Sequence, residues 1–139
     1  MSGEVGIRGP EIQYGPNGPH DASKPFTSTQ LTRLDEALTL SSRESGLVFS
    51  IYVGDLKAPT RGHAEALFER LNDNSVLLAV SPGQRVVHIV TGPGSATRLP
   101  NRACALAALA MRASFANGDL TGGLIAGLRS LADYAGSTR

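Results

Sequence analysis

Two aspartates, Asp55 and Asp119, are the residues whose type and position could support chemistry. Asp55 follows the apolar run 47–53, which predicts a buried strand, and Asp119 opens the last predicted helix. Ligands of α/β folds usually bind at the carboxyl ends of parallel strands, and the predicted chain path brings both aspartates to that end. Two carboxylates with backbone carbonyls there could hold Ca²⁺ or Mg²⁺. The alternative, which the sequence favours, is a helix cap at Asp119 and a solvated turn residue at Asp55.

Other candidate catalytic groups lack the spacing that catalysis needs. The histidines His20, His63 and His88 form no H-x-x-x-H pair for zinc, and no serine stands in a G-x-S-x-G elbow. The loop 92–100 has neither the G-x-x-x-x-G-K phosphate loop nor the third glycine of a dinucleotide fingerprint. We therefore predict no catalytic residue, and we expect His88 to be a hydrogen-bonded structural histidine.

The stretch SFANGDLTGGLIAGL, residues 114–128, combines a helix break with several glycines. Asn-Gly ends one helix with Gly118 in the left-handed conformation, and Asp119 can cap the next. Each later glycine costs about 1 kcal/mol in a helix interior relative to alanine, so an offsetting contact is expected. Gly123 and Gly127 share one helix face, which favours close packing against the preceding alanine-rich helix. Approach of a ligand to the helix start is the alternative.

Hydrophobic periodicity predicts the elements that must position these residues. The predicted order is helix, strand, helix, strand, strand, helix and helix, over residues 27–46, 47–53, 59–73, 76–81, 85–91, 101–117 and 119–136. Thr27 and Gln30 fit the capping box of the first helix. Pro82 and Gly83 suit a type II turn between the last two strands. The helix 101–117 is apolar nearly all round, which predicts a buried helix.

This order predicts an α/β fold. The first two predicted strands and the helix between them form a βαβ unit with parallel strands, and the third strand returns antiparallel as a hairpin. The expected architecture is a three-layer α/β/α sandwich, with a small mixed sheet and helices on both faces. Residues 1–25 hold five of the 16 glycines and four of the 8 prolines, so we predict a flexible arm there and a folded domain over 26–139. Within the arm, a small edge hairpin of EVGIR and EIQYG is the alternative.

Composition narrows the function classes. A net charge of +1 with 4 Phe, 3 Tyr and no Trp argues against nucleic-acid binding. No window reaches 18 apolar residues, so we expect no membrane span and a cytoplasmic protein. The single cysteine, Cys104, forms no intramolecular disulfide, and its alanine-rich and leucine-rich surroundings predict a buried, inert thiol.

Three segments resemble the TPM domain family. They are HAEALFERL, SVLLAVSPGQRVVHIVTGPG and ASFANGDLTGGLIAGLRSL, and the likeness covers residues 27–136. More narrowly the chain is similar to small uncharacterised actinobacterial proteins within or beside that family. The resemblance implies an α/β/α sandwich, divalent-metal binding in some members and a proposed acid-phosphatase activity in plant members. Asp119 matches a family acidic position, whereas Asn101 replaces the usual acidic residue at the start of its helix.

Two functions remain open from the sequence. The favoured one is a non-catalytic binding or accessory module for a protein partner, with modulation by a divalent cation as an option. The alternative is a metal-dependent phosphatase in which Asp55 and Asp119 hold the ion, while Arg85 and the start of the last helix receive phosphate. We expect no other cofactor, and a monomer or weak homo-oligomer.

Overall fold

The computed structural model describes residues 10–16 and 26–136 of the 139-residue chain. Within them the elements, in chain order, are β1 (Ile12–Tyr14), α1 (Ser28–Ser45), β2 (Val48–Val53), α2 (Thr60–Phe68), β3 (Ser75–Ser81), β4 (Val86–Thr91), the short 3₁₀ helix η1 (Ser95–Thr97), α3 (Asn101–Ala116) and α4 (Leu120–Ala135). Their bounds agree closely with the predicted ranges except at α2, which ends at Phe68 where the prediction extends to residue 73. The additions are η1 and β1, and β1 lies in the predicted arm.

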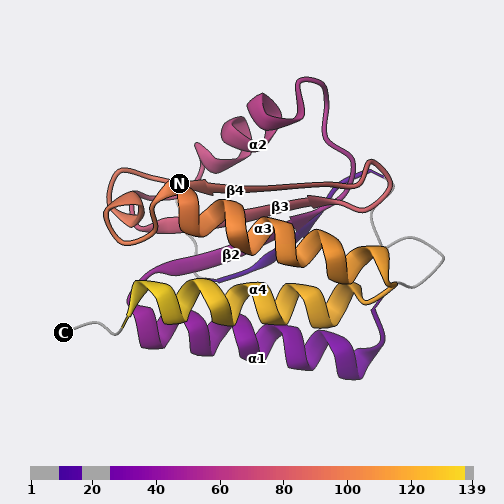
Figure 1. Ribbon diagram of the computed structural model, residues 1–139, viewed down its shortest axis with the longest axis horizontal. Coiled ribbons are helices and arrows are strands. Elements are labelled where there is room, and N and C mark those ends of the chain that lie inside the picture. The colour runs from indigo at the N-terminus through magenta and orange to yellow at the C-terminus, as the bar shows by residue number, and fades with distance from the viewer. Residues whose placement is uncertain (1–9, 17–25, 137–139) are drawn as a thin grey trace, which may run out of the picture.

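The sheet has the order β1-β2-β3-β4 (Figure 1). β1, β2 and β3 are parallel, and β4 pairs antiparallel with β3. The predicted βαβ unit and hairpin are therefore confirmed as β2–α2–β3 and β3–β4. All seven residues of β3 are buried, as expected for an inner strand covered on both faces.

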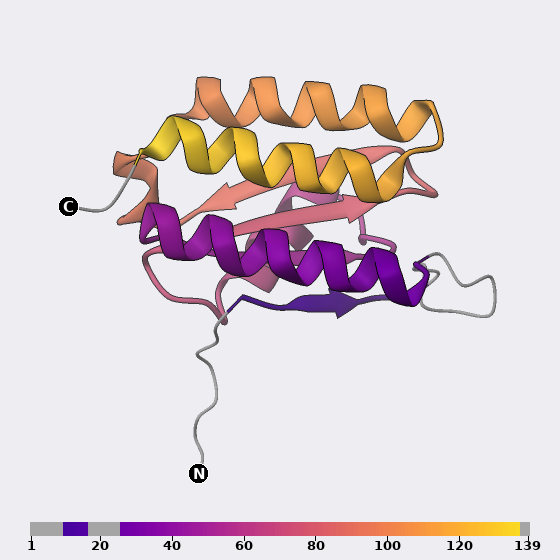
Figure 2. The same cartoon turned by 90° about the horizontal axis from the view of Figure 1, so that it is seen from below.

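Helices cover both faces of this sheet, so the predicted three-layer sandwich is confirmed. α2 lies alone on one face, and α1, α3 and α4 cover the other (Figure 1). Figure 2 shows these three helices side by side, with α4 between α1 and α3. α3 contacts α4 and β4, so it is the helix at the β4 edge of its layer. Among the helices of residues 10–16 and 26–136, α3 therefore has a neighbour on one flank only.

The N-terminal strand corrects the predicted domain boundary. Ile12–Tyr14 pairs with Ile51–Val53, so this part of the predicted flexible arm, residues 1–25, belongs to the sheet. Ile12 packs against the main core. The junction is tight, because a Cβ on Gly54 would lie 2.6 Å from the Gly15 Cα. β1 lies in the EIQYG half of the alternative edge hairpin, whose EVGIR half lies outside the described residues. The rest of that arm lies outside the described residues.

The packing of α3 against α4 explains the glycines of residues 114–128. A Cβ on Gly123 would lie 2.7 Å from the Phe115 ring, and a Cβ on Gly127 would lie 2.8 Å from Met111 Cγ. The prediction of close helix packing is thus confirmed for both glycines. Gly122 has a different reason: the Asp119 carboxylate folds over it, and a Cβ there would collide with that carboxylate.

The β3–β4 turn differs from its prediction. A type II turn needs a positive φ at Gly83, but the positive φ is at Arg85, with a value of 60°. Gln84 N donates to Ser81 O at 3.2 Å and Arg85 N donates to Pro82 O at 3.2 Å, so two successive turns precede the left-handed residue. The loop is one turn longer than the Pro-Gly pair indicates.

Candidate functional site

Asp55 lies in a cavity at the carboxyl ends of the parallel strands. The cavity has a volume of about 760 Å³ and is lined by Gln13, Tyr14, Gly15, Pro16, Tyr52, Asp55, Leu56, Lys57, His63, Leu67, Arg70 and Gln84. This is the position where α/β folds usually bind ligands, so the topological prediction for Asp55 is confirmed. None of the described residues that line it is a serine, threonine or cysteine.

Hydrogen bonds fix the polar groups of this cavity. Lys57 N donates to His63 Nδ1 at 2.8 Å. The Tyr52 hydroxyl donates to the Asp55 backbone carbonyl at 2.7 Å. Burial, and secondarily the Asp55 charge, raises the pKa of Tyr52, which keeps its phenol protonated. The cavity offers donors and cations beside one carboxylate, an arrangement suited to binding a polar group.

Asp119 lies elsewhere at this end of the fold. Its Oδ1 accepts from Gly122 N at 2.9 Å as the N-cap of α4, so the predicted helix cap is confirmed. Its neighbours Gly118 and Leu120 line a different cavity, which shares no lining residue with the cavity of Asp55. Among the residues that the structure describes, no group of three or more His, Cys, Asp or Glu could hold a metal ion. The Ca²⁺ or Mg²⁺ site at Asp55 and Asp119 stays a prediction.

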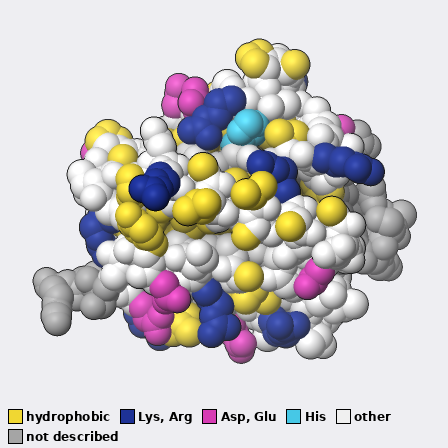
Figure 3. Space-filling model, viewed as in Figure 1, with side chains coloured by type: hydrophobic (Ala, Val, Ile, Leu, Met, Phe, Trp, Pro, Cys, Tyr) yellow, Lys and Arg dark blue, Asp and Glu magenta, His cyan; other side chains and the backbone are white. Residues whose placement is uncertain are grey.

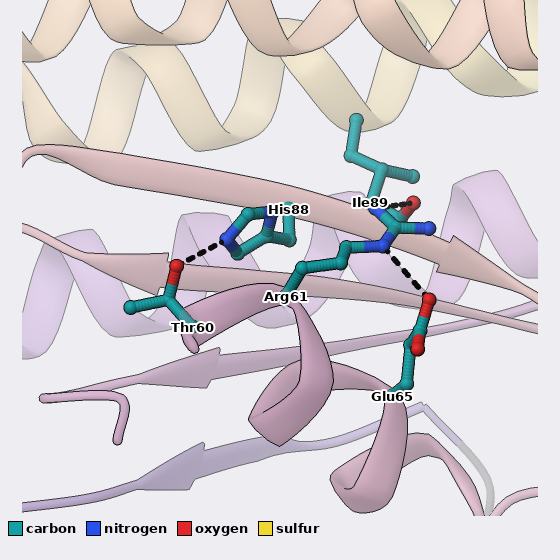
Figure 4. A network of polar contacts seen from close by, with 5 residues as sticks. All are labelled: Thr60, Arg61, Glu65, His88 and Ile89. Atoms are coloured by element: carbon teal, nitrogen blue, oxygen red, sulfur yellow. Dashed lines mark hydrogen bonds and ion pairs between the residues drawn. The ribbon is translucent and has the colours of Figure 1, made fainter. Parts of the chain in front are cut away.

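His88 joins β4 to α2 through a polar network (Figure 4). Its Nε2 lies 2.8 Å from the Thr60 hydroxyl, so the prediction of a hydrogen-bonded structural histidine is confirmed. Beside it, Arg61 donates from its guanidinium to the Ile89 carbonyl at 3.2 Å and pairs with Glu65 at 3.1 Å. Val87 and Ile89 of this edge strand are buried, at 4% and 5% exposure.

The outward flank of α3 is the largest departure from the sequence analysis. The helix was predicted to be buried because it is apolar nearly all round, yet Leu106 is 61% exposed and Leu109 is 58% exposed. The buried side of α3 consists of small or flexible residues, namely Ala103, Cys104, Ala107, Ala108 and Met111. Alanine and leucine on both sides of the helix produced the all-round pattern, and the pattern alone could not tell a covered side from an open one.

We define the α3 face as the exposed residues on this flank: Arg102, Ala105, Leu106, Leu109, Ala110, Arg112 and Ala113. Within it Arg102, Leu106, Leu109 and Ala113 follow steps of four, three and four residues, the spacing of a helix-packing seam. Figure 3 shows hydrophobic side chains in a row over α3, with basic side chains beside them. α3 contains two arginines and no aspartate or glutamate. The face is therefore apolar along its middle and positive near its ends.

Comparison with known proteins places the chain in a family. The family model of a domain of unknown function, DUF5130, matches residues 14–132. The chain belongs to the DUF5130 family. The match includes the end of β1 and nearly all of α4, so the family domain is the whole sandwich.

Relatives of this DUF5130 chain include "Uncharacterized protein Rv2468c" and "Uncharacterized protein MT2543" from two strains of Mycobacterium tuberculosis. Each is 39% identical over 109 residues, which is 77% of this chain and 65% of the relative. The chain thus spans slightly less than two thirds of the length of these relatives.

Solved structures share the fold of the DUF5130 domain. The BA42 protein of Bizionia argentinensis has a TM-score of 0.72 at 13% identity, over 82% of this chain and 86% of that one. The N-terminal domain of a P. gingivalis protein has a TM-score of 0.68 at 18% identity, over 90% and 80%. The N-terminal domain of Corynebacterium glutamicum cg2496 has a TM-score of 0.64 at 15% identity, over 99% and 86%. These likenesses show the fold alone.

The family match corrects the resemblance to the TPM domain family. DUF5130 is the family whose model matches, and none of the three similar structures is described as a TPM domain. The TPM assignment is therefore wrong. Strand-turn-strand and helix-break segments of the kind that suggested it are set by the fold, so they do not discriminate between families that share a sandwich.

Two further predictions concern Cys104 and the membrane. Cys104 is 8% exposed, and burial raises the pKa of its thiol, so the prediction of a buried thiol is confirmed. Within residues 10–16 and 26–136, none of the helices has the length and apolar character needed to cross a bilayer.

Proposed function

We propose that this DUF5130 domain is a protein-docking module and that its partner binds the α3 face. The observation that supports the proposal is the exposure of Leu106 and Leu109 on the flank of α3 that, within the described residues, faces away from α4. Two leucines in a row of alanines form a contiguous apolar surface, and such surfaces on soluble domains mark interaction sites. The spacing of four, three and four residues suits a helix laid along a groove or seam.

The charges of the α3 face favour one kind of partner, an acidic amphipathic helix. Arg102 and Arg112 flank the leucines, and α3 itself has no carboxylate to pair with them. A helix with apolar residues facing Leu106 and Leu109, and with glutamate or aspartate near each end, would complement both the apolar row and the arginines. The interaction is then steered by charge and weakens as salt is added.

A second copy of this chain fits the α3 face less well. An antiparallel pair of α3 helices centred on residue 107 places Arg102 against the Arg112 of the other copy. A parallel pair places each arginine against its equivalent. Both arrangements oppose like charges with no carboxylate on α3 between them, which disfavours self-association through this face.

The phosphatase alternative needs Asp55 and Asp119 to hold the ion and Arg85 with the start of α4 to receive phosphate, and of these only Arg85 and the start of α4 line one cavity. The family likeness that suggested this activity is corrected, and Asp55 lines a cavity that Asp119 does not line. We therefore propose the docking function and leave the cation site as a separate prediction.

Site-specific photocrosslinking tests the proposal in the cells that make the protein. A photoreactive amino acid replaces Leu106 in one variant and Leu40 in the control, because Leu40 is 51% exposed on α1, away from the α3 face. We expect a discrete adduct with another protein from position 106 and none from position 40. No adduct at 106, equal adducts at both positions, or an adduct with a second copy of this chain would contradict the proposal.

A further inference from the structure

A second cavity lies where the β3–β4 turn meets the α3–α4 turn. It has a volume of about 500 Å³ and is lined by Ser81, Pro82, Arg85, Val86, Arg112, Phe115, Ala116, Gly118 and Leu120. Cavities of this size are large enough for a small organic ligand. None of the residues in this lining belongs to the cavity that holds Asp55.

The walls of this cavity are mainly apolar. Phe115 and Leu120 contribute from the two helices and are partly buried against the main core, and Val86 contributes from β4. A Cβ on Gly118 would meet nothing within 4 Å, so the backbone there is open. The Ser81 hydroxyl, which is the buried polar group of the lining, hydrogen bonds to Gln84 Oε1 and is thus satisfied.

The charged groups of the lining are two arginines, Arg85 and Arg112. Asp119 stands between Gly118 and Leu120 in the chain, but its carboxylate accepts from Gly122 N in the first turn of α4. None of the residues that line the cavity is acidic. The cavity thus combines apolar walls with two guanidinium groups, which bind carboxylates through paired, charge-assisted hydrogen bonds.

Arg85 occupies a backbone conformation that arginine does not favour. Its φ of 60° is the only positive φ at a non-glycine residue within the described parts of the chain. Glycine or asparagine would suit this left-handed position better, and a larger side chain costs about 1 kcal/mol there. The turn keeps a guanidinium at the cavity at the expense of local stability, a pattern that recurs at binding sites.

We propose that this cavity binds an apolar carboxylate. Arg85 and Arg112 hold the carboxylate, and Val86, Phe115 and Leu120 surround the apolar body. The proposal goes beyond the docking function, because Leu106 and Leu109 do not line the cavity and Arg112 alone belongs to both the α3 face and the lining. The same chemistry is presented by a free carboxylic acid and by the C-terminal apolar residue of a peptide.

Titration of ¹⁵N-labelled protein followed by NMR tests this proposal. The probes are N-acetyl-leucine, its uncharged amide, acetyl-Gly-Gly-Leu and inorganic phosphate. We expect N-acetyl-leucine to shift the amide signals of Val86, Phe115, Gly118 and Leu120, with at least about tenfold weaker binding of the amide, because a charge-assisted pair of hydrogen bonds is lost. If acetyl-Gly-Gly-Leu binds more tightly than N-acetyl-leucine, the ligand is the C-terminus of a peptide. If the two bind equally, the ligand is a small carboxylic acid.

Two variants and one control sharpen the result. Arg85→Gly removes a guanidinium and suits the left-handed backbone, so we expect at least about tenfold weaker binding with an unchanged or raised melting temperature. Arg112→Gln should weaken binding similarly. Arg129→Gln removes an exposed arginine of α4 that does not line this cavity and should leave binding unchanged.

Three results would overturn the proposal. They are equal binding of N-acetyl-leucine and its amide, phosphate shifts as large as those of N-acetyl-leucine, and no shift at the cavity residues with any probe. None of them bears on the α3 face, since photocrosslinking at Leu106 tests that surface separately.

Discussion

His88 shows how single side chains connect the layers of this fold. It lies on the α2 side of β4, bonded to Thr60, and its neighbour Arg61 reaches across the strand to the Ile89 carbonyl. Burial lowers the pKa of His88 first of all, and the charges of Arg61 and Arg112 lower it further, while Glu65 acts in the opposite direction. The folded protein therefore prefers the neutral imidazole.

This preference predicts a pH dependence of stability. Because the pKa of His88 is lower in the folded than in the unfolded chain, the unfolded chain binds more protons as pH falls below about 6.5. The contribution of the neutral His88 ring to the free energy of unfolding is fully present above that pH. It is lost as the pH falls through the lower pKa of the folded protein. We expect His88→Gln to reduce the loss between pH 6.5 and 5, measured by urea unfolding. The same loss in both proteins would contradict this explanation.

Asp119 has a defined structural role, which separates two interpretations of its carboxylate. As the N-cap of α4 it accepts from Gly122 N, and Asp119→Ala should lower the free energy of unfolding by about 0.5–2 kcal/mol. We expect this loss to be the same in metal-depleted buffer and with added Ca²⁺ or Mg²⁺, measured by thermal unfolding. If either cation stabilises the native sequence but not Asp119→Ala, the carboxylate is a ligand as well as a cap.

At the scale of elements, α3 has one side that holds the fold together and one that does not. Its inner side packs tightly on α4, where Gly123 and Gly127 admit Phe115 and Met111. Its outer side has two leucines more than half exposed. Selection for stability explains the first side, whereas the second needs another reason, and we infer that docking supplies it.

This asymmetry predicts that an exposed leucine of α3 and a buried leucine of α4 contribute very differently to the free energy of unfolding. Leu106→Glu should change the free energy of unfolding by less than about 0.5 kcal/mol, because its side chain is already in water. Leu124→Ala should lower it by about 2–5 kcal/mol, because Leu124 of α4 is 0% exposed. Chemical denaturation measures both values. A large loss from Leu106→Glu would mean that Leu106 serves the fold.

At the scale of the whole molecule, β1 completes the sheet and shields β2. Gly15 N donates to Val53 O at 2.9 Å, Ile51 N donates to Glu11 O at 2.9 Å and Asp55 N donates to Pro16 O at 2.7 Å. Without these bonds β2 would be an open edge, and exposed edges promote association between chains.

Truncation tests this role of β1. A chain that begins at residue 26 should melt at least about 4 °C lower than one that begins at residue 10, and it should associate as its concentration rises. Differential scanning calorimetry and light scattering measure the two effects. Equal melting temperatures would support a dispensable arm over residues 1–25.

The sequence predicted most of the architecture because strong local signals agreed with the global pattern. The capping box at Thr27 and the helix break at Gly118 both appear in the structure. The pairing of β1 with β2 was missed because three residues in a polar segment have no period. The α3 face was missed because apolar periodicity shows only which residues can be buried. Which of these residues are buried depends on the order α1–α4–α3 of the helices in space. Asp55 was placed correctly by topology, but one wall of its cavity comes from Gln13 and Tyr14 of β1, whose parallel pairing with β2 was not predicted.

The central claim is that a protein docks on the α3 face through apolar and charged contacts. Charge reversal combined with crosslinking at position 106 tests this claim most directly. Arg102 and Arg112 are changed to glutamate together, and the matched control changes the exposed Arg33 of α1 and Arg129 of α4 in the same way. The account predicts that the adduct from position 106 disappears in the first variant and persists in the control. Persistence of the adduct in the Arg102 and Arg112 variant, or its loss in the control as well, would contradict the account.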